Sequence, residues 1–328
     1  MASPSSLPNA TVLVTGAAGF VGSNLVAALV ERHGARVIAV DDLFTGDREH
    51  LRSVMDRIEF RVACVTDDDT AAIVREGADY VFHLAARNII ASTEDPVRDF
   101  DVNARGTLKL LMAARESKRL KRFVYSSTAS VYGNPQGLPA SEGDPTSFLS
   151  PYAASKHAGE AYCQVFYEQY GVSTSVVRYS NVYGRNQSPK NPYCGVVGKF
   201  TRAALAGEAL LIHGDGEQTR DYTYISDAVD ATIAVAVSAN ASGHTYNVGS
   251  GAETSVNRLA EIIVDATGSK SPVQYLDRRD IDNVRRRVLN IEKIRREVRW
   301  SPQVSLRQGL QRTVAWHRET AEAAAGIG

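Results

Sequence analysis

Tyr152 and Lys156 are the pair of side chains in this sequence best suited to acid–base chemistry. Residues four apart lie on one face of a helix, where a lysine ammonium favours the phenolate form of the tyrosine. A free tyrosine titrates near pH ~10, so a tyrosine base at neutral pH requires a pKa lower by roughly three units. Ser127 and Thr128, earlier in the chain, could hold a substrate hydroxyl against that base. The same spacing also occurs on solvent-exposed helices, so the interpretation depends on the elements that would position the pair.

A glycine-rich turn near the N-terminus supplies the first of those elements. Residues 11–14 are rich in β-branched side chains and predict a strand, and residues 23–30 predict an apolar helix. Between them, glycines stand at every third position: Gly16, Gly19 and Gly22. Glycines let the backbone approach a pyrophosphate, while the helix N-terminus offers free N–H groups. The spacing differs from the commoner G-x-G-x-x-G, but the order strand, turn, helix indicates a dinucleotide site.

Asp41 and Asp42 follow the next predicted strand, residues 35–40. A carboxylate at this strand end is placed to accept hydrogen bonds from the adenosine ribose, and it would repel the extra phosphate of NADP. We therefore predict that Asp41 selects NAD, whereas Asp42 is equally consistent with a solvated acid in a turn. Arg48 lies close by in the sequence and leaves a lesser NADP interpretation open.

Short apolar segments alternate with helical segments through the first half of the chain. Further strands are predicted at residues 57–62, 80–84, 122–126 and 175–178, and long helices at 97–118 and 152–170. This alternation predicts an α/β fold with a doubly wound parallel Rossmann sheet, in which ligands bind at the carboxyl ends of the strands. Each motif described above falls at such an end.

The alternation of strands and helices stops at Arg185, which indicates a second, smaller part of the molecule. A chain of 328 residues is long enough for one large domain and a smaller lobe. We expect this lobe to bind substrate and to be interleaved with the large domain. The predicted boundaries are an NAD-binding Rossmann domain over residues 1–184, with 208–250 returning to it, and a substrate-binding lobe over 185–207 and 251–328.

The composition excludes several classes of partner. The chain has 37 basic and 37 acidic residues, which argues against a nucleic-acid or anionic-membrane surface. Its cysteines, Cys64, Cys163 and Cys194, lack metal-ligand spacing and fit a reducing compartment. No apolar run reaches spanning length, and the first nine residues lack the apolar segment of a signal peptide. We therefore expect a soluble, cytoplasmic protein with no metal site and no nucleic-acid or membrane partner.

Several motifs stand in the order seen in extended short-chain dehydrogenase/reductases, which the chain resembles over residues 10–318. Besides the glycine turn, Asp41 and the Tyr152–Lys156 pair, they are residues 82–86, Asn103-x-x-Gly106-Thr107, and residues 178–184, 213–216 and 220–222. They are most similar to the nucleotide-sugar branch, and within it to the UDP-glucose 4-epimerase type. The resemblance implies NAD held through the catalytic cycle, a nucleotide-sugar substrate, and a cytosolic homodimer paired through the helices at 97–118 and 152–170.

The resemblance also implies roles for individual residues. In the mechanism that it implies, Tyr152 takes the proton of the sugar C4 hydroxyl, Lys156 stabilises the phenolate, and Thr128 with Ser127 relays the proton. The expected cofactor-binding residues are Gly16, Gly19, Phe20, Val21, Gly22, Asp41, Asp42, Thr45, Val65, Leu84, Ala85, Ala86, Asn103, Ser126, Tyr152, Lys156 and Tyr179. The expected substrate contacts are Arg87, Asn88, Ser127, Thr128, Asn181, Arg220, Arg279 and Arg285. His83 is expected to pack in the core.

Two departures from the family pattern bear on affinity and on chemistry. Cys64 and Val65 stand where the family commonly has an acid and a branched apolar residue, so the hydrogen bond of that acid to adenine is lost. The related 4,6-dehydratases carry Asp-Glu after the threonine, and the decarboxylases keep a glutamate before Val-Tyr-Gly. This chain has Ala129 and Ser130 there, and neither side chain can act as the general acid or base that those reactions need. Dehydration and decarboxylation are therefore disfavoured.

Reversible oxidation remains, and we predict 4-epimerisation of a UDP-hexose through a 4-keto intermediate. Arg287 falls near the position that controls bulk at the sugar C2, so it either excludes N-acetyl groups or pairs with a uronate; Asn181 favours neutral sugars. A cytidine base and attack at C2 stay open. The alternatives are an NAD(P)H-dependent 4-keto nucleotide-sugar reductase and a non-catalytic nucleotide-binding relative.

Overall fold

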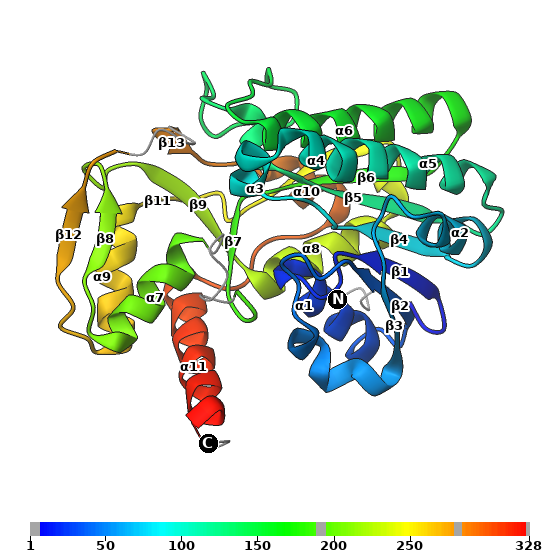
Figure 1. Ribbon diagram of the computed structural model, residues 1–328. Helices are drawn as coiled ribbons and strands as arrows, with labels where there is room; N and C mark the ends of the chain where they lie inside the picture. The colour runs from blue at the N-terminus through cyan, green and yellow to red at the C-terminus, as the bar shows by residue number, and fades with distance from the viewer. Residues whose placement is uncertain (1–6, 188–194, 279–283, 326–328) are drawn as a thin grey trace.

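The computed structural model describes residues 7–187, 195–278 and 284–325. Its centre is a seven-stranded sheet in which all neighbours are parallel, in the order β10-β6-β5-β4-β1-β2-β3 (Figure 1). These strands are β1 (Thr11–Thr15), β2 (Arg36–Asp41), β3 (Ile58–Val62), β4 (Tyr80–His83), β5 (Arg122–Thr128), β6 (Thr174–Tyr179) and β10 (His244–Val248). The predicted doubly wound parallel sheet is confirmed.

Helices cover both faces of this sheet, so two hydrophobic cores form. Val12 and Val14 of β1 pack into one core, while Leu13 between them packs into the other. On the sheet, α1 (Phe20–Glu31) and α8 (Ile225–Val237) pack into the first core, which continues into helices of the smaller lobe. Into the second core pack α2 (Asp68–Glu76), α5 (Gly106–Glu116) and α6 (Pro151–Tyr170). A sheet that is buried on both faces requires nearly continuous apolar strands, which is the pattern from which it was predicted.

The long helix predicted over residues 97–118 is interrupted in the structure. It follows α3 (Ile89–Glu94) and consists of α4 (Pro96–Phe100), a π-helical turn over Asp101–Arg105, and α5. The turn contains Asn103, whose side chain is fully buried and bonds to the loop after β4. Single π turns of this kind are frequent at functional sites.

The smaller lobe lies beside the large sheet (Figure 1). One of its sheets contains β7 (Asn181–Tyr183), β9 (Thr219–Tyr224), β11 (Glu253–Ser255) and β13 (Arg286–Arg287), and the other pairs β8 (Leu210–His213) with β12 (Val273–Leu276). Its helices are α7 (Val196–Ala206), α9 (Val256–Thr267) and α11 (Leu306–Ala325). The remaining elements are α10 (Glu292–Val298), which packs near β10, and 3₁₀ helices over Arg48–Arg57, Ala129–Tyr132 and Ala239–Ala241.

The predicted return of residues 208–250 to the large sheet is too wide. β8 and β9 belong to the small sheets, so only α8 and β10 return. β8 alternates buried and exposed residues, as in a sheet with one face in water, whereas the last residues of β10 are all buried. The lobe also begins earlier than predicted, because β7 pairs with β9. None of the described helices is both long and apolar enough to cross a membrane.

Candidate active site

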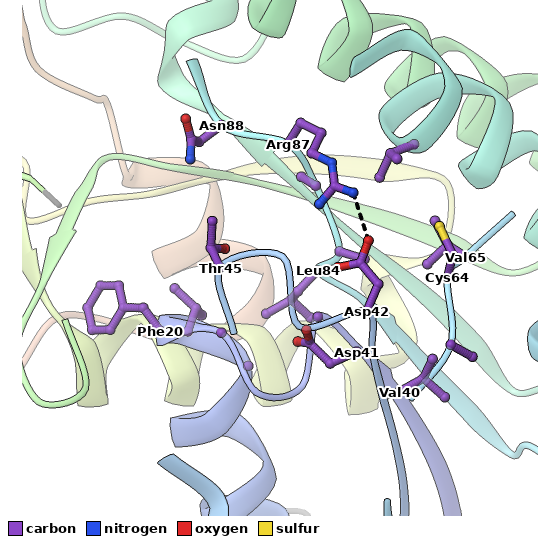
Figure 2. A pocket seen from close by; sticks show the side chains of 18 of the residues that line it. Phe20, Val40, Asp41, Asp42, Thr45, Cys64, Val65, Leu84, Arg87 and Asn88 are labelled. Carbon is purple, nitrogen blue, oxygen red and sulfur yellow. Dashed lines mark hydrogen bonds and ion pairs between the residues drawn. The ribbon is translucent and has the colours of Figure 1, made fainter. Parts of the chain in front are cut away.

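A cavity of about 340 Å³ lies at the carboxyl ends of β1, β2 and β4 (Figure 2). It extends from the glycine turn to Tyr152. The predicted site residues that line it are Gly16, Gly19, Phe20, Val21, Gly22, Asp41, Asp42, Thr45, Val65, Leu84, Ala85, Ala86, Arg87, Asn88 and Tyr152. Val40, Ala63, Cys64 and Val102 complete the lining. The structure thus brings residues from separate segments of the sequence into one cavity at a sheet edge.

The glycine turn between β1 and α1 is packed so tightly that side chains are excluded. Gly16 has a φ of +69°, and a Cβ atom there would lie 2.7 Å from the backbone nitrogen of Ala85. A Cβ atom on Gly22 would overlap the carbonyl of Gly16. α1 starts after Gly19 with no side-chain cap and no acidic residue in its first turn. Its first N–H groups can therefore bind an anion, which fits the pyrophosphate of a dinucleotide.

Asp41 links the glycine turn to the loop after β2. Its carboxylate accepts hydrogen bonds from the backbone nitrogen of Ala18 at 2.9 Å and from that of Leu43 at 2.8 Å. Burial raises the pKa of Asp41, and these backbone hydrogen bonds oppose that effect in part. Asp41 lines the cavity where we predicted a ribose acceptor, and it also has a structural role that the sequence did not indicate.

Arg87 lines the cavity and is paired within the protein. Its guanidinium donates to the carboxylate of Asp42 at 2.8 Å and lies 3.8 Å from the ring centroid of Phe44. Figure 2 shows Arg87 and Asp42 pointing toward each other across the cavity. The sequence contains no signal that pairs these residues, which are 45 positions apart, and the sugar contact of Arg87 stays a prediction.

Two asparagines expected to bind ligands have structural roles in the loop after β4. Asn103 accepts a hydrogen bond from the backbone nitrogen of Arg87 at 2.7 Å and donates to the Arg87 carbonyl at 3.1 Å. It is fully buried and does not line the cavity. The side-chain oxygen of Asn88 accepts from the first backbone N–H groups of α3 and so caps that helix, although Asn88 still lines the cavity.

Ser126 and Tyr179, which we expected to contact the cofactor, are both buried and do not line the cavity. The phenol oxygen of Tyr179 lies 2.6 Å from the hydroxyl of Thr232 on α8, so its side chain joins the core beneath the sheet edge. Only backbone groups of these two residues remain available to a ligand.

Tyr152 reaches the cavity from the start of α6. Ser150 caps this helix, and the backbone nitrogen of Tyr152 donates to the hydroxyl of Ser92 at 3.1 Å, which fixes the first turn. Burial raises the pKa of Tyr152 to about 12, and a hydrogen bond with Thr128 opposes that rise in part. The predicted fall in this pKa is therefore not produced by the polypeptide alone. Ser92 is a positioning residue that the sequence analysis missed.

Lys156 is held in an apolar setting one helical turn beyond Tyr152. Its side chain is 1% exposed, and its ammonium lies 4.3 Å from the ring centroid of Tyr125. Burial lowers the pKa of Lys156 to about 8, although the charges of Glu160 and Asp99 act in the opposite direction. The amine has no hydrogen-bond partner among the described residues. Lys156 does not itself line the cavity, but a cation so poorly solvated favours negative charge that forms close to it.

Glu160, one further turn along α6, forms a buried ion pair with Arg178 of β6. The two side chains make hydrogen bonds of 2.9 Å and 2.7 Å, and each is 6% exposed. Although burial acts to raise it, hydrogen bonds from His157 and Arg178 hold the pKa of Glu160 below its usual range. Ser127 is buried beside this carboxylate. The sequence contained one signal for Glu160: it follows Lys156 by four residues and so lies on the same face of the predicted helix.

His83 is a core residue, as predicted. It is fully buried, and its ring nitrogens lie 2.7 Å from the hydroxyl of Thr15 and 2.9 Å from that of Thr107. Burial lowers its pKa to about 3, so the imidazole is neutral and ties β4 to β1 and α5.

The predicted substrate residues of the lobe are distributed over β7, β9 and the segment before β13. Asn181 begins β7 and is exposed, and Arg220 of β9 donates to the carbonyls of Thr219 and Val284. Arg287 of β13 is the register partner of Arg220, so their side chains leave the same face. Arg285 is exposed and pairs with Asp215 at 2.7 Å. Arg279 lies outside the described residues.

A scan against protein-family models finds a match over residues 12–249. The matching model describes the NAD dependent epimerase/dehydratase family. The match covers the large sheet and the first part of the lobe.

Individual relatives cover nearly the whole chain. A UDP-glucose 4-epimerase of Mycolicibacterium smegmatis is 39% identical, over 94% of this chain and 99% of the relative. A crystal structure of UDP-glucose 4-epimerase from Thermotoga maritima with UDP-glucose superimposes with a TM-score of 0.89 at 36% identity, covering 95% of this chain and 99% of the other. A UDP-N-acetyl-alpha-D-glucosaminuronate decarboxylase of Bacillus cytotoxicus is 35% identical, over 94% of this chain and 97% of the relative. The similar proteins thus catalyse more than one reaction.

Proposed function

The chain belongs to the NAD dependent epimerase/dehydratase family, and from this premise we propose that it is an epimerase of nucleotide sugars. The proposed reaction inverts C4 of the hexose of a UDP-sugar through a 4-keto intermediate, with no net oxidation. A relative named as a UDP-glucose 4-epimerase, and a similar structure solved with UDP-glucose, support this substrate class.

Tyr152, which lines the cavity, has a separate role in proton transfer from those of Thr128 and Lys156 behind it. NAD, when bound, supplies the hydride acceptor and a positive charge in the crevice. Tyr152 takes the proton of the C4 hydroxyl, and Thr128, its hydrogen-bond partner, orients that hydroxyl. Lys156 stabilises the phenolate that forms, because its ammonium is desolvated and has no hydrogen-bond partner among the described residues. Tyr152 then returns the proton to the C4 oxygen, after the 4-keto sugar has rotated to present its other face.

The residues directly after Thr128 distinguish epimerisation from elimination of water. Ala129 is 3% exposed, and the backbone nitrogen of Ser130 donates to the hydroxyl of Thr128 at 3.1 Å. Neither side chain can act as an acid or base near pH 7. Elimination of water from a 4-keto sugar requires such a pair in addition to the tyrosine. Among the reactions of the family, this site therefore supports epimerisation best.

Arg220 and Arg287 are the arginines that we propose for the sugar diphosphate. They lie side by side on β9 and β13, and Arg287 is only 4% exposed. Two planar guanidinium groups on one face suit a diphosphate, which accepts several hydrogen bonds at once. Arg285 is less suited, because it is exposed and paired with Asp215. Asn181 at the start of β7 favours a neutral hexose over a uronate.

NMR of the sugars after incubation of the protein with UDP-glucose, UDP-glucuronate and their N-acetyl analogues tests the proposed reaction. We expect an equilibrium mixture of the two C4 epimers from one of these substrates, with no change in the total NADH. A 4-keto-6-deoxy sugar would show a dehydratase, and a pentose would show a decarboxylase. Stoichiometric consumption of NADH by a 4-keto sugar would show a reductase.

We also propose that the protein is a homodimer paired through α4, α5 and α6. Large apolar side chains are exposed on these helices: Val97 72%, Phe100 55%, Met112 56%, Val165 45% and Tyr170 46%. Large apolar side chains exposed on helices that pack against one another are typical of an interaction site. Sedimentation of Met112→Lys should show monomer, whereas Leu211→Lys, on the equally exposed β8, should remain dimeric. A monomeric parent protein would contradict the proposal.

The cytoplasm is the compartment that we propose for this protein. Cys64 and Cys163 are free thiols, and unpaired cysteines are typical of a reducing compartment. Fractionation of cells that express the full chain tests this, and recovery outside the cytoplasm would contradict it.

A further inference from the structure

An ion pair joins two loops across the cofactor cavity. Asp42 follows β2, Arg87 follows β4, and the guanidinium donates to the carboxylate at 2.8 Å (Figure 2). The Arg87 side chain is 9% exposed and that of Asp42 28% exposed. Phe44 lies under the guanidinium, with its ring centroid 3.8 Å from Cζ. The three side chains form a unit in which Asp42 and Arg87 line the cavity and Phe44 supports the guanidinium.

The position of this unit in the sheet determines what it can do. β2 and β4 are the two neighbours of β1, and the glycine turn leaves the carboxyl end of β1. The Asp42–Arg87 pair therefore spans the end of β1, between the part of the cavity lined by Val65 and the part lined by Tyr152. A dinucleotide that occupies the whole cavity has to pass this point.

Arg87 is held in place by its backbone and by Asp42, and one donor of its side chain remains for a ligand. Both its N–H and its carbonyl are bonded to the buried Asn103, at 2.7 Å and 3.1 Å. The Nε atom is buried and has no hydrogen-bond partner among the described residues. A buried donor without a partner is unfavourable, and an acceptor is expected nearby. The phosphate oxygens of a dinucleotide are the acceptors that this cavity is built to receive.

The alternative is that the pair serves only the stability of the fold. Buried ion pairs contribute little to stability compared with apolar residues, because the charges lose their hydration. A purely structural pair also has no need of an unsatisfied donor beside a cavity. The geometry therefore favours a role toward the ligand.

We propose that Asp42, Phe44 and Arg87 form a clasp, which closes over the bound dinucleotide and slows its release. The inference rests on NAD being the cofactor and adds the residues that retain it between turnovers. The glycine turn and Asp41 bind the cofactor, and the clasp restricts its exit from the cavity. Tight retention suits an enzyme whose cofactor ends each cycle in its starting state.

The rate of NADH release tests this directly, without any turnover of sugar. The protein is loaded with NADH and mixed with excess NAD, and the loss of bound NADH fluorescence is followed. Arg87→Ala should release NADH about 10- to 100-fold faster, because it removes the side chain that spans the exit and the loss of ligand contacts acts mainly on dissociation. Arg87→Lys should fall between this variant and the parent, since it keeps the charge but loses the planar group over Phe44.

The matched control is Arg98→Ala, because Arg98 also lies at the rim of the cavity, beside Cys64, but spans nothing. Its release rate should stay within about twofold of the parent, as expected for a surface charge. Asp42→Ala should accelerate NADH release. The double variant should release NADH at nearly the same rate as Arg87→Ala alone. An unchanged release rate in Arg87→Ala, or equal acceleration by Arg98→Ala, would overturn the clasp. A loss of thermal stability in Arg87→Ala with no change in release would do the same and show a structural pair.

Discussion

An ion pair beneath the active site and one in the smaller lobe differ in how deeply they are buried. Beneath the active site, Arg178 and Glu160 are paired with side chains 6% exposed, and Lys156 is 1% exposed. In the lobe, Arg285 and Asp215 are paired at the surface, with side chains 54% and 59% exposed. The buried pair is held in one position, whereas the surface pair can exchange its partners for water.

Removal of the Tyr152 hydroxyl should give the largest effect. Tyr152→Phe should lower the epimerisation rate by about 10²- to 10⁴-fold, the usual range for loss of a general base. Cofactor binding should be retained, because the hydroxyl is not part of the glycine turn. Tyr222→Phe is the matched control in the lobe, since that hydroxyl is buried without a hydrogen-bond partner in the described part of the chain. Near-normal turnover in Tyr152→Phe would show that Tyr152 is not the general base of the reaction.

Breaking the two ion pairs tests the comparison directly. Glu160→Gln leaves Arg178 buried without its counter-charge, so the free energy of unfolding should fall by about 3–5 kcal/mol in urea titrations. Asp215→Asn should have no measurable effect on unfolding, because both partners are in water. Equal losses in the two variants would show that burial does not distinguish the regions.

The Glu160 contribution should also depend on pH. The pKa of this carboxyl is lowered in the folded protein from an ordinary value of 4.5. A carboxylate of this kind stabilises the protein fully above that value, and the contribution is lost as the pH falls below it. The difference between the parent and Glu160→Gln should therefore shrink in acid. A constant difference from pH 7 to pH 3 would contradict the assignment.

Lys156 should shift stability in the opposite direction. Its pKa is about 8 in the folded protein against 10.5 in the free side chain, so the unfolded state holds more protons between these values. Stability should rise with pH through this window. Lys156→Met should be more stable than the parent at pH 7, by about 3 kcal/mol, while losing activity. Lys121→Met, at an exposed lysine, is the control. A less stable Lys156→Met would show that the buried amine is a favourable structural group.

The large sheet was predictable because its signals are local. Residues such as Leu13 and Val14 lie in apolar runs that must be buried, and each run is followed by a turn or cap with its own signature. The glycine turn, Asp41 and Tyr152 could be placed at one sheet edge because parallel strands share their carboxyl ends. The predicted strand ends, together with the family resemblance, therefore account for most of the cavity lining.

Side-chain pairs that join distant segments could not be predicted. Arg87 with Asp42, and Ser92 with Tyr152, depend on loop geometry that no periodicity encodes. The pKa of Tyr152 was predicted to fall because spacing alone indicates a nearby cation, but spacing does not reveal how completely the phenol is desolvated. The lobe strands were missed for a related reason: β7 and β13 are too short to show alternation.

The position of β10 at the edge of the large sheet has a consequence for synthesis of the chain. β10 pairs with β6, yet β7, α7, β8, β9 and α8 all precede it in the sequence. A nascent chain that ends before His244 exposes an unpaired parallel edge of apolar backbone, which favours aggregation. The ribosome has to complete much of the lobe before the first sheet is protected, so truncation after the glycine and tyrosine motifs would yield an insoluble fragment rather than a minimal nucleotide-binding unit.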